Sequence, residues 1–146
     1  MTGQLSSSPK FGFQDTSFKA AGGVDGITSL VDAFYEVMDT LPQAAIIRAM
    51  HADDLDITRD KLSRFLCGWL GGPRLFREKY GTISLTGVHS HLAIGEAERD
   101  AWLECMRLAI AEQDYSPAFS SYLLEQLAVP AERVRVICER QDTASA

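Results

Sequence analysis

The chain has 146 residues, of which 46% are hydrophobic and 23% are charged, and its formal net charge at pH 7 is -6. This length and balance predict one soluble globular domain and exclude a largely disordered chain. The longest apolar runs fall far short of the ~20 residues of a membrane-spanning helix, and an acidic chain is poorly suited to nucleic-acid phosphates. We therefore expect no membrane and no nucleic-acid partner and, since no secretory signal opens the sequence, a cytoplasmic protein.

The first segment, residues 1–13, is rich in glycine and serine and contains Pro9, so we expect a flexible N-terminal tail. From residue 24 onward, apolar side chains recur at steps of three and four, which predicts a helix with one buried face. This stripe consists of Ile27, Leu30, Val31, Phe34, Met38 and Leu41. Tyr35 has the same spacing from Val31 and Met38, so its phenol is predicted to face inward. Pro42 is predicted to end the helix and to begin the next one.

A second stripe predicts a helix from about residue 58, ended by the glycines and proline of residues 71–73. Its apolar members are Leu62, Phe65, Leu66, Trp69 and Leu70. Residues 73–93 have no sustained period, and we expect short helical turns joined by loops there, with His89 on one of them.

Two further helices are predicted in the last third of the chain. The first begins after Gly95 and carries an apolar stripe of Ala101, Trp102, Cys105, Met106 and Ala109. The second begins at the pair Ser116-Pro117, a favourable N-cap and first helical residue, and Pro130 is predicted to kink or restart it. The predicted fold class is therefore all-α, with a domain over residues 14–140 and a flexible C-terminal tail over 141–146.

The chain has few residues of the types that bind metal ions. The only histidines are His51, His89 and His91, and they lack the neighbours of a zinc site at the required spacing. Haem needs only one axial imidazole from the protein, so haem fits this inventory better than a bare metal ion. The three cysteines lack Cys-x-x-Cys spacing, and we expect buried reduced thiols.

Several segments together closely resemble the group II truncated haemoglobins, over about residues 18–139. The segments that carry the resemblance are Phe34-Tyr35, 50–55, 69–73, Tyr80-Gly81, His89, Ile94-Gly95 and 98–106. Each segment alone is a weak signal, whereas their order and spacing are specific. The resemblance implies a truncated globin, a two-over-two helical sandwich enclosing one haem b, in which the helices led by residues 24 and 58 face those led by 95 and 117.

The same resemblance implies roles for individual residues. His89 would be the proximal ligand of the haem iron, and Tyr35, Trp102 and His51 would face the bound gas. The haem pocket would be lined by Phe34, Thr58, Leu62, Phe65, Phe76, Tyr80 and Ile94.

The chain departs from the family near the proximal histidine. Family members usually carry His-Pro after the Tyr-Gly pair and basic residues shortly before the histidine, where this chain has residues 82–83, Thr86 and Val88. Those cations normally pair with the haem propionates, and the remaining candidates are Arg74, Arg77 and Lys79. His91 would replace His89 as the ligand if the turn slipped by two residues.

These expectations favour a haem protein that binds oxygen and other small diatomic gases, NO and CO, for oxygen transport or sensing. A tyrosine hydroxyl and an indole N–H in a dry pocket stabilise the partial negative charge that the bound gas acquires. Two alternatives stay open, a haem enzyme that detoxifies nitric oxide or peroxide with a reductase as partner, and a haem-free helical interaction module that kept the fold.

Overall fold

The computed structural model describes residues 11–81 and 94–145, with side chains described as far as residue 138. These residues form helices and no strand, so the predicted all-α class is confirmed. The elements are α2 (Thr16–Ala20), α3 (Gly23–Thr40), the 3-10 helix η1 (Pro42–Ala44), α4 (Ala45–Ala49), α5 (Asp56–Trp69), α6 (Leu75–Tyr80), α8 (Glu96–Ala111) and α9 (Pro117–Ser145). Within the described residues, no helix is long and apolar enough to span a bilayer.

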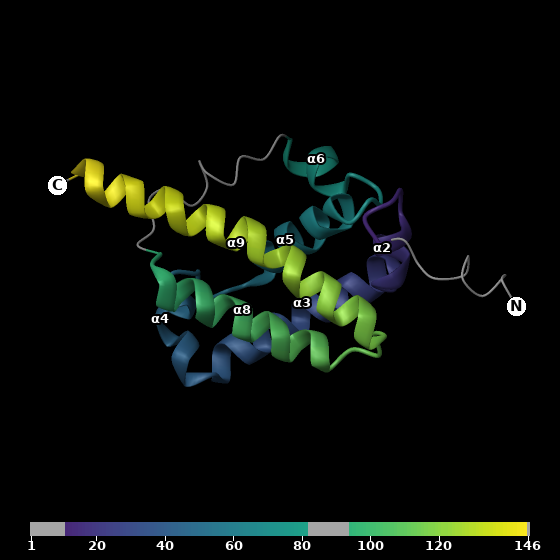
Figure 1. The fold of residues 1–146 in the computed structure, drawn as a ribbon, viewed down its shortest axis with the longest axis horizontal. Coiled ribbons are helices and arrows are strands. Elements are labelled where there is room, and N and C mark those ends of the chain that lie inside the picture. The colour runs from purple at the N-terminus through teal and green to yellow at the C-terminus, as the bar shows by residue number, and fades with distance from the viewer. Residues whose placement is uncertain (1–10, 82–93, 146) are drawn as a thin grey trace, which may run out of the picture.

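The helices form two layers, α3 with α5 and α8 with α9, as the sequence predicts. Helix α3 packs against both α5 and α8, and α8 packs against α9. In Figure 1, α8 and α9 lie side by side in front of α3, while α5 lies behind α9 and α6 lies at the upper edge. Among the described residues, α5 and α9 are not a closely packed pair, so the two layers join mainly through α3 and α8.

The core lies where α3, α5, α8 and α9 meet. The largest fully buried side chains include Ile27, Leu30, Phe34, Met38, Leu66, Met106, Phe119 and Leu123. Burial of each such side chain contributes roughly 1.5–3 kcal/mol, so the apolar stripes of the sequence account for most of the packing. All three cysteines, Cys67, Cys105 and Cys138, are buried and none forms a disulfide.

The chain before α3 is anchored to the last helix and to the end of α5. The Phe11 ring lies 5.0 Å from that of Tyr122 and 5.1 Å from that of Phe119, between centroids. Gly71 has a φ of 95°, and a Cβ there would lie 1.9 Å from the carbonyl oxygen of Gln14, so only glycine fits this close approach. Residue 11 therefore contacts the domain, although it belongs to the predicted tail; the domain limits themselves stay predictions.

Helix α9 begins as predicted and then runs uninterrupted through Pro130. The Ser116 hydroxyl accepts the N–H of Phe119 at 3.1 Å, which caps the first turn before Pro117. Beyond Pro130, Glu132 accepts hydrogen bonds from Arg99 of α8 and from Arg135, each at 2.7 Å. The predicted restart at Pro130 is not observed, because loss of one backbone donor leaves the remaining helical bonds in place.

Candidate functional site

Aromatic side chains from α3, α8 and the residue after α4 meet at one place. The Phe34 ring contacts both the Tyr35 ring, at 4.9 Å between centroids, and the Trp102 ring, at 5.2 Å. The His51 imidazole lies edge-on to Tyr35 at 5.8 Å. The structure thus brings together the three side chains that the sequence analysis assigns to the gas-binding side, with Phe34 wedged between two of them.

Tyr35 has the polar group with the strongest perturbation in this cluster. Its side chain is 4% exposed, as expected for a residue on the buried stripe of α3. Burial raises the pKa of the phenol, and the positive charge of Arg59 offsets the rise only in part. Tyr35 therefore keeps its proton at all physiological pH values and remains a hydrogen-bond donor.

His51 has a defined orientation. Its Nδ1 lies 2.8 Å from the carbonyl oxygen of Ile47, and its backbone N–H donates to the carbonyl of Arg48 at 3.1 Å. A carbonyl can only accept, so this contact requires the proton on Nδ1. The ring is thus fixed both in position and in tautomer beside Tyr35.

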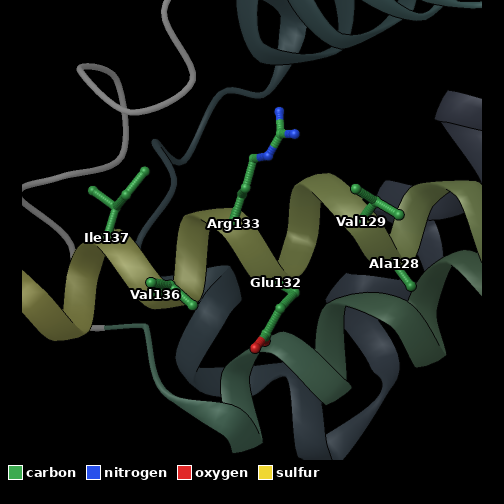
Figure 2. Close-up of a pocket in the computed structure, with 6 residues that line it drawn as sticks. All are labelled: Ala128, Val129, Glu132, Arg133, Val136 and Ile137. Atoms are coloured by element: carbon green, nitrogen blue, oxygen red, sulfur yellow. The ribbon is translucent and has the colours of Figure 1, made fainter.

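A hollow of about 570 Å³ lies along the second half of α9. It is lined by Ala128, Val129, Glu132, Arg133, Val136 and Ile137. Figure 2 shows Val129, Arg133 and Ile137 on the side of α9 away from α8, whereas Glu132 points toward α8. The lining is apolar apart from two charged residues, and one of these, Glu132, is paired with arginines.

A second hollow of about 260 Å³ lies between α5 and α6. Its walls combine three aromatic residues with three arginines: Arg64, Phe65, Gly68, Trp69, Arg74, Phe76, Arg77 and Gly81. Phe65 and Trp69 stack at 6.5 Å, one helical turn apart. This wall offers flat apolar faces beside positive charge.

Several large apolar side chains around these hollows are incompletely covered. Val129 is 54% exposed. Leu62, Phe65 and Trp69 of α5 and Trp102 of α8 are only half-buried, although they lie on the apolar stripes of their helices. Apolar side chains that face other helices but are not covered by them indicate a surface for an apolar ligand.

Polar side chains join α5 to the end of α6. Asp60 accepts hydrogen bonds from the Tyr80 hydroxyl at 2.6 Å, from Lys79 Nζ at 2.9 Å and from Arg64 Nε at 2.9 Å. These donors hold the pKa of the Asp60 carboxyl well below its usual range, with the Tyr80 bond as the largest cause. The structure therefore places Tyr80 and Lys79, predicted as a pocket residue and a propionate partner, on Asp60.

The remaining predicted residues are more scattered. Thr58 on α5, Phe76 on α6 and Ile94 before α8 are half-buried, whereas Arg74 and Arg77 are exposed beside the second hollow. His89, predicted as the iron ligand, and His91, its alternative, lie outside the described residues.

Sequence reasoning missed two groups of residues at the site. The face of α9 from Val129 to Ile137 was given no part in a site, although its helical spacing, with Val136 and Ile137 seven and eight residues after Val129, is visible in the sequence. Asp60 and Arg64 are one turn apart on α5, but their contact with α6 depends on the placement of two helices and leaves no local signal.

Comparison with known proteins gives consistent matches over most of the chain. The family model for bacterial-like globins matches residues 16–135. A curated relative, the group 2 truncated hemoglobin YjbI of Bacillus subtilis (strain 168), is 30% identical over 123 residues, which are 84% of this chain and 91% of that protein.

Solved structures agree with these sequence matches. The group II 2-on-2 hemoglobin of Agrobacterium tumefaciens is 37% identical with a TM-score of 0.77, over 82% of this chain and 92% of that one. The truncated oxygen-avid haemoglobin of Bacillus subtilis is 30% identical with a TM-score of 0.74, over 81% of this chain and 97% of that one. The predicted two-over-two arrangement of the helices is therefore confirmed.

Proposed function

Because this chain belongs to the bacterial-like globin family, among the group II truncated haemoglobins, we propose that it holds one haem b and binds oxygen, NO or CO beside Tyr35 and Trp102. The cluster formed by Tyr35, Phe34, Trp102 and His51 carries the proposal. A related haemoglobin of Bacillus subtilis is described as oxygen-avid. A cytoplasmic location and a reductase as partner remain proposals from the sequence.

The residues present fit a flat apolar group that carries carboxylates. Ligand pockets of roughly 300–1,000 Å³ enclose groups of this size, and the hollow along α9 has about 570 Å³. The half-buried faces of Phe65 and Trp69 supply apolar contact, and arginines beside them match carboxylates because a guanidinium binds both oxygens at once. We assign the propionates to Arg74 and Arg77 rather than to Lys79, which is paired with Asp60 at 2.9 Å.

Haem supplies the iron that coordinates a diatomic gas, and the protein supplies the surroundings of that gas. The Tyr35 hydroxyl and the Trp102 indole N–H are donors held on two helices by the same Phe34 ring. Each donor bond to the gas would contribute about 1–1.5 kcal/mol, or about tenfold in dissociation rate. Two such donors favour slow release, which suits sensing or storage better than simple transport.

Absorption spectroscopy of the full chain with added ferric haem tests this function. We expect a globin-like carbonyl spectrum after reduction and addition of carbon monoxide, abolished in His89→Ala and retained in His91→Ala. Loss in His91→Ala alone would move the iron ligand to His91. A chain that takes up no haem would overturn the proposed function and favour a haem-free module.

A further inference from the structure

We propose that Arg48 is a positioning residue of the gas-binding side, because it ties the segment that carries His51 to the helix that carries Tyr35. The inference rests on the proposed function for its effect on gas release. The contacts that support it lie wholly among described residues and involve none of the side chains that face the gas.

The segment that carries His51 has little structure of its own. Helix α4 has only five residues, and the next helix, α5, begins at Asp56. Ala52, Asp53 and Asp54, between the two helices, are exposed. Segments with few buried apolar contacts open locally at low free energy, and between the His51 bond to Ile47 and the buried side chain of Leu55 these three residues depend on contacts from outside the segment.

Arg48 provides that tether through three groups at once. Its Nε donates to the carboxylate of Asp39, its Nη1 donates to the carbonyl oxygen of Ala52 at 3.0 Å, and its Nη2 donates to that of Asp53 at 3.2 Å. The planar guanidinium has its donors in a fixed fork, so the three bonds form together without further ordering of the side chain. The Arg48 side chain is 24% exposed, which limits competition from water.

The tether leads directly to the gas-binding side. Asp39 lies on α3 one turn beyond Tyr35, so Arg48 connects the segment 50–55 to the same helix that presents the phenol. His51 lies next to the two carbonyls that Arg48 holds, and its own N–H donates to the Arg48 carbonyl at 3.1 Å. Loss of the guanidinium therefore frees the chain directly after His51, and we infer that this loosens the edge-on contact of the imidazole with Tyr35, 5.8 Å between ring centroids, although the bond to the Ile47 carbonyl remains.

Two substitutions separate the effect of the two carbonyl hydrogen bonds from the effect of the positive charge of Arg48. Arg48→Gln removes both, whereas Arg48→Lys keeps the charge and the pairing with Asp39 but cannot reach both carbonyls. Arg107→Gln is the matched control, because Arg107 is an exposed arginine whose charge pairs with Glu104 on its own helix, α8. All variants are made in the full chain.

Three readouts decide the proposal. In Arg48→Gln we expect the amides of residues 50–54 to exchange with deuterium about tenfold faster. The NMR shift that the Tyr35 ring induces on the His51 Hε1 proton should disappear. Oxygen release from the haem-loaded protein should accelerate three- to tenfold. Arg48→Lys should lie between wild type and Arg48→Gln, and Arg107→Gln should match wild type. Faster deuterium exchange of these amides with an unchanged His51 resonance would show that Arg48 stabilises the segment without positioning the imidazole, and it would overturn the proposal.

The outcomes distinguish this inference from the proposed function. If the wild type forms no carbonyl complex, the proposed function fails, and the His51 resonance of the haem-free chain still decides whether Arg48 positions the ring. If the complex forms and oxygen release is equal in wild type and Arg48→Gln, the proposed function stands and the role of Arg48 in gas binding is overturned.

Discussion

Tyr35 combines near-complete burial with a neutral hydroxyl, and both follow from its place on α3. The apolar stripe turns the side chain inward, where it is 4% exposed, and burial raises the pKa of the phenol. A phenol that keeps its proton can donate a hydrogen bond at neutral pH. The spacing in the sequence predicted the inward direction, and the aromatic contacts with Phe34 and His51 show what the side chain meets there.

We expect Tyr35→Phe and Trp102→Phe each to accelerate oxygen release about tenfold in the haem-loaded protein, since each removes one donor of about 1–1.5 kcal/mol. Stopped-flow mixing with excess carbon monoxide measures the release rate. Tyr122→Phe serves as the control, because Tyr122 lies near the start of α9 and packs against Phe11 and Phe119 rather than against Phe34, Tyr35 or Trp102. Unchanged rates in both variants would assign Tyr35 and Trp102 to core packing alone.

At the scale of elements, Asp60 is the point where α6 is attached to α5. Its carboxylate accepts bonds from Tyr80 and Lys79 of α6 and from Arg64 of its own helix. Helix α6 is six residues long and has no fully buried residue, so apolar burial contributes little to holding it in place. The contacts of Asp60 with Lys79 and Tyr80 therefore hold the last turn of α6 against α5.

We expect Asp60→Asn to lower the free energy of unfolding by about 1 kcal/mol, a modest value because the carboxylate is about one-third exposed and water screens it. Because the folded-state pKa of Asp60 lies below the ordinary value of 3.8, this contribution is complete above that value and is lost as the pH falls through the lower folded-state pKa. Urea unfolding at pH 7, 5 and 3 should show a constant difference from wild type at the first two pH values and a smaller one at pH 3. Asp114→Asn, at an exposed position in the loop before α9, should show no difference at pH 7; an equal loss there would contradict the assignment.

The helices themselves were largely predictable from the sequence, while their polar contacts were not. Predicted starts at residues 24, 58, 95 and 117 compare with observed starts at 23, 56, 96 and 117, because apolar spacing is a local property. The bond between Asp60 and Tyr80 joins residues 20 positions apart, and such a contact exists only once two helices are placed. Lys79 shows the same limit, since the sequence makes it one of three candidate partners for a propionate but does not reveal its ion pair with Asp60.

For the whole molecule, the decisive feature is apolar surface that the fold leaves uncovered between its two layers. Helices α5 and α9 do not pack closely on each other among the described residues, and Val129 on α9 is 54% exposed. The sequence predicted one side of this region, with Leu62 and Phe65, from periodicity and resemblance. It gave the α9 side no part in a site, because apolar spacing shows that a helix face is buried but not whether a ligand or another helix covers it.

We expect Val129→Gln to accelerate haem loss about tenfold, since a buried apolar side chain of this size contributes about 1.5 kcal/mol to the contact. Transfer of haem to an excess of an acceptor globin measures the rate. Without added haem, the variant should unfold at the same temperature as the wild type, because Val129 is 54% exposed and contributes little to the packing of the helices. Val24→Gln, at a comparably exposed valine at the start of α3, should change neither quantity, and equal rates of haem loss in both variants would place the cofactor elsewhere.

The burial of the three thiols has a consequence for the lifetime of a protein that handles oxygen. Peroxide attacks the thiolate, and the protonated thiol reacts far more slowly. Burial, aided by the charge of Glu104, raises the pKa of Cys105 to about 11, and burial also raises the pKa of Cys67. Cys105 follows Trp102 by less than one helical turn, so a sulfur close in sequence to the aromatic cluster of Phe34, Tyr35 and Trp102 is held as an unreactive thiol. Burial of the thiols thereby slows their oxidation by peroxide relative to that of exposed cysteines.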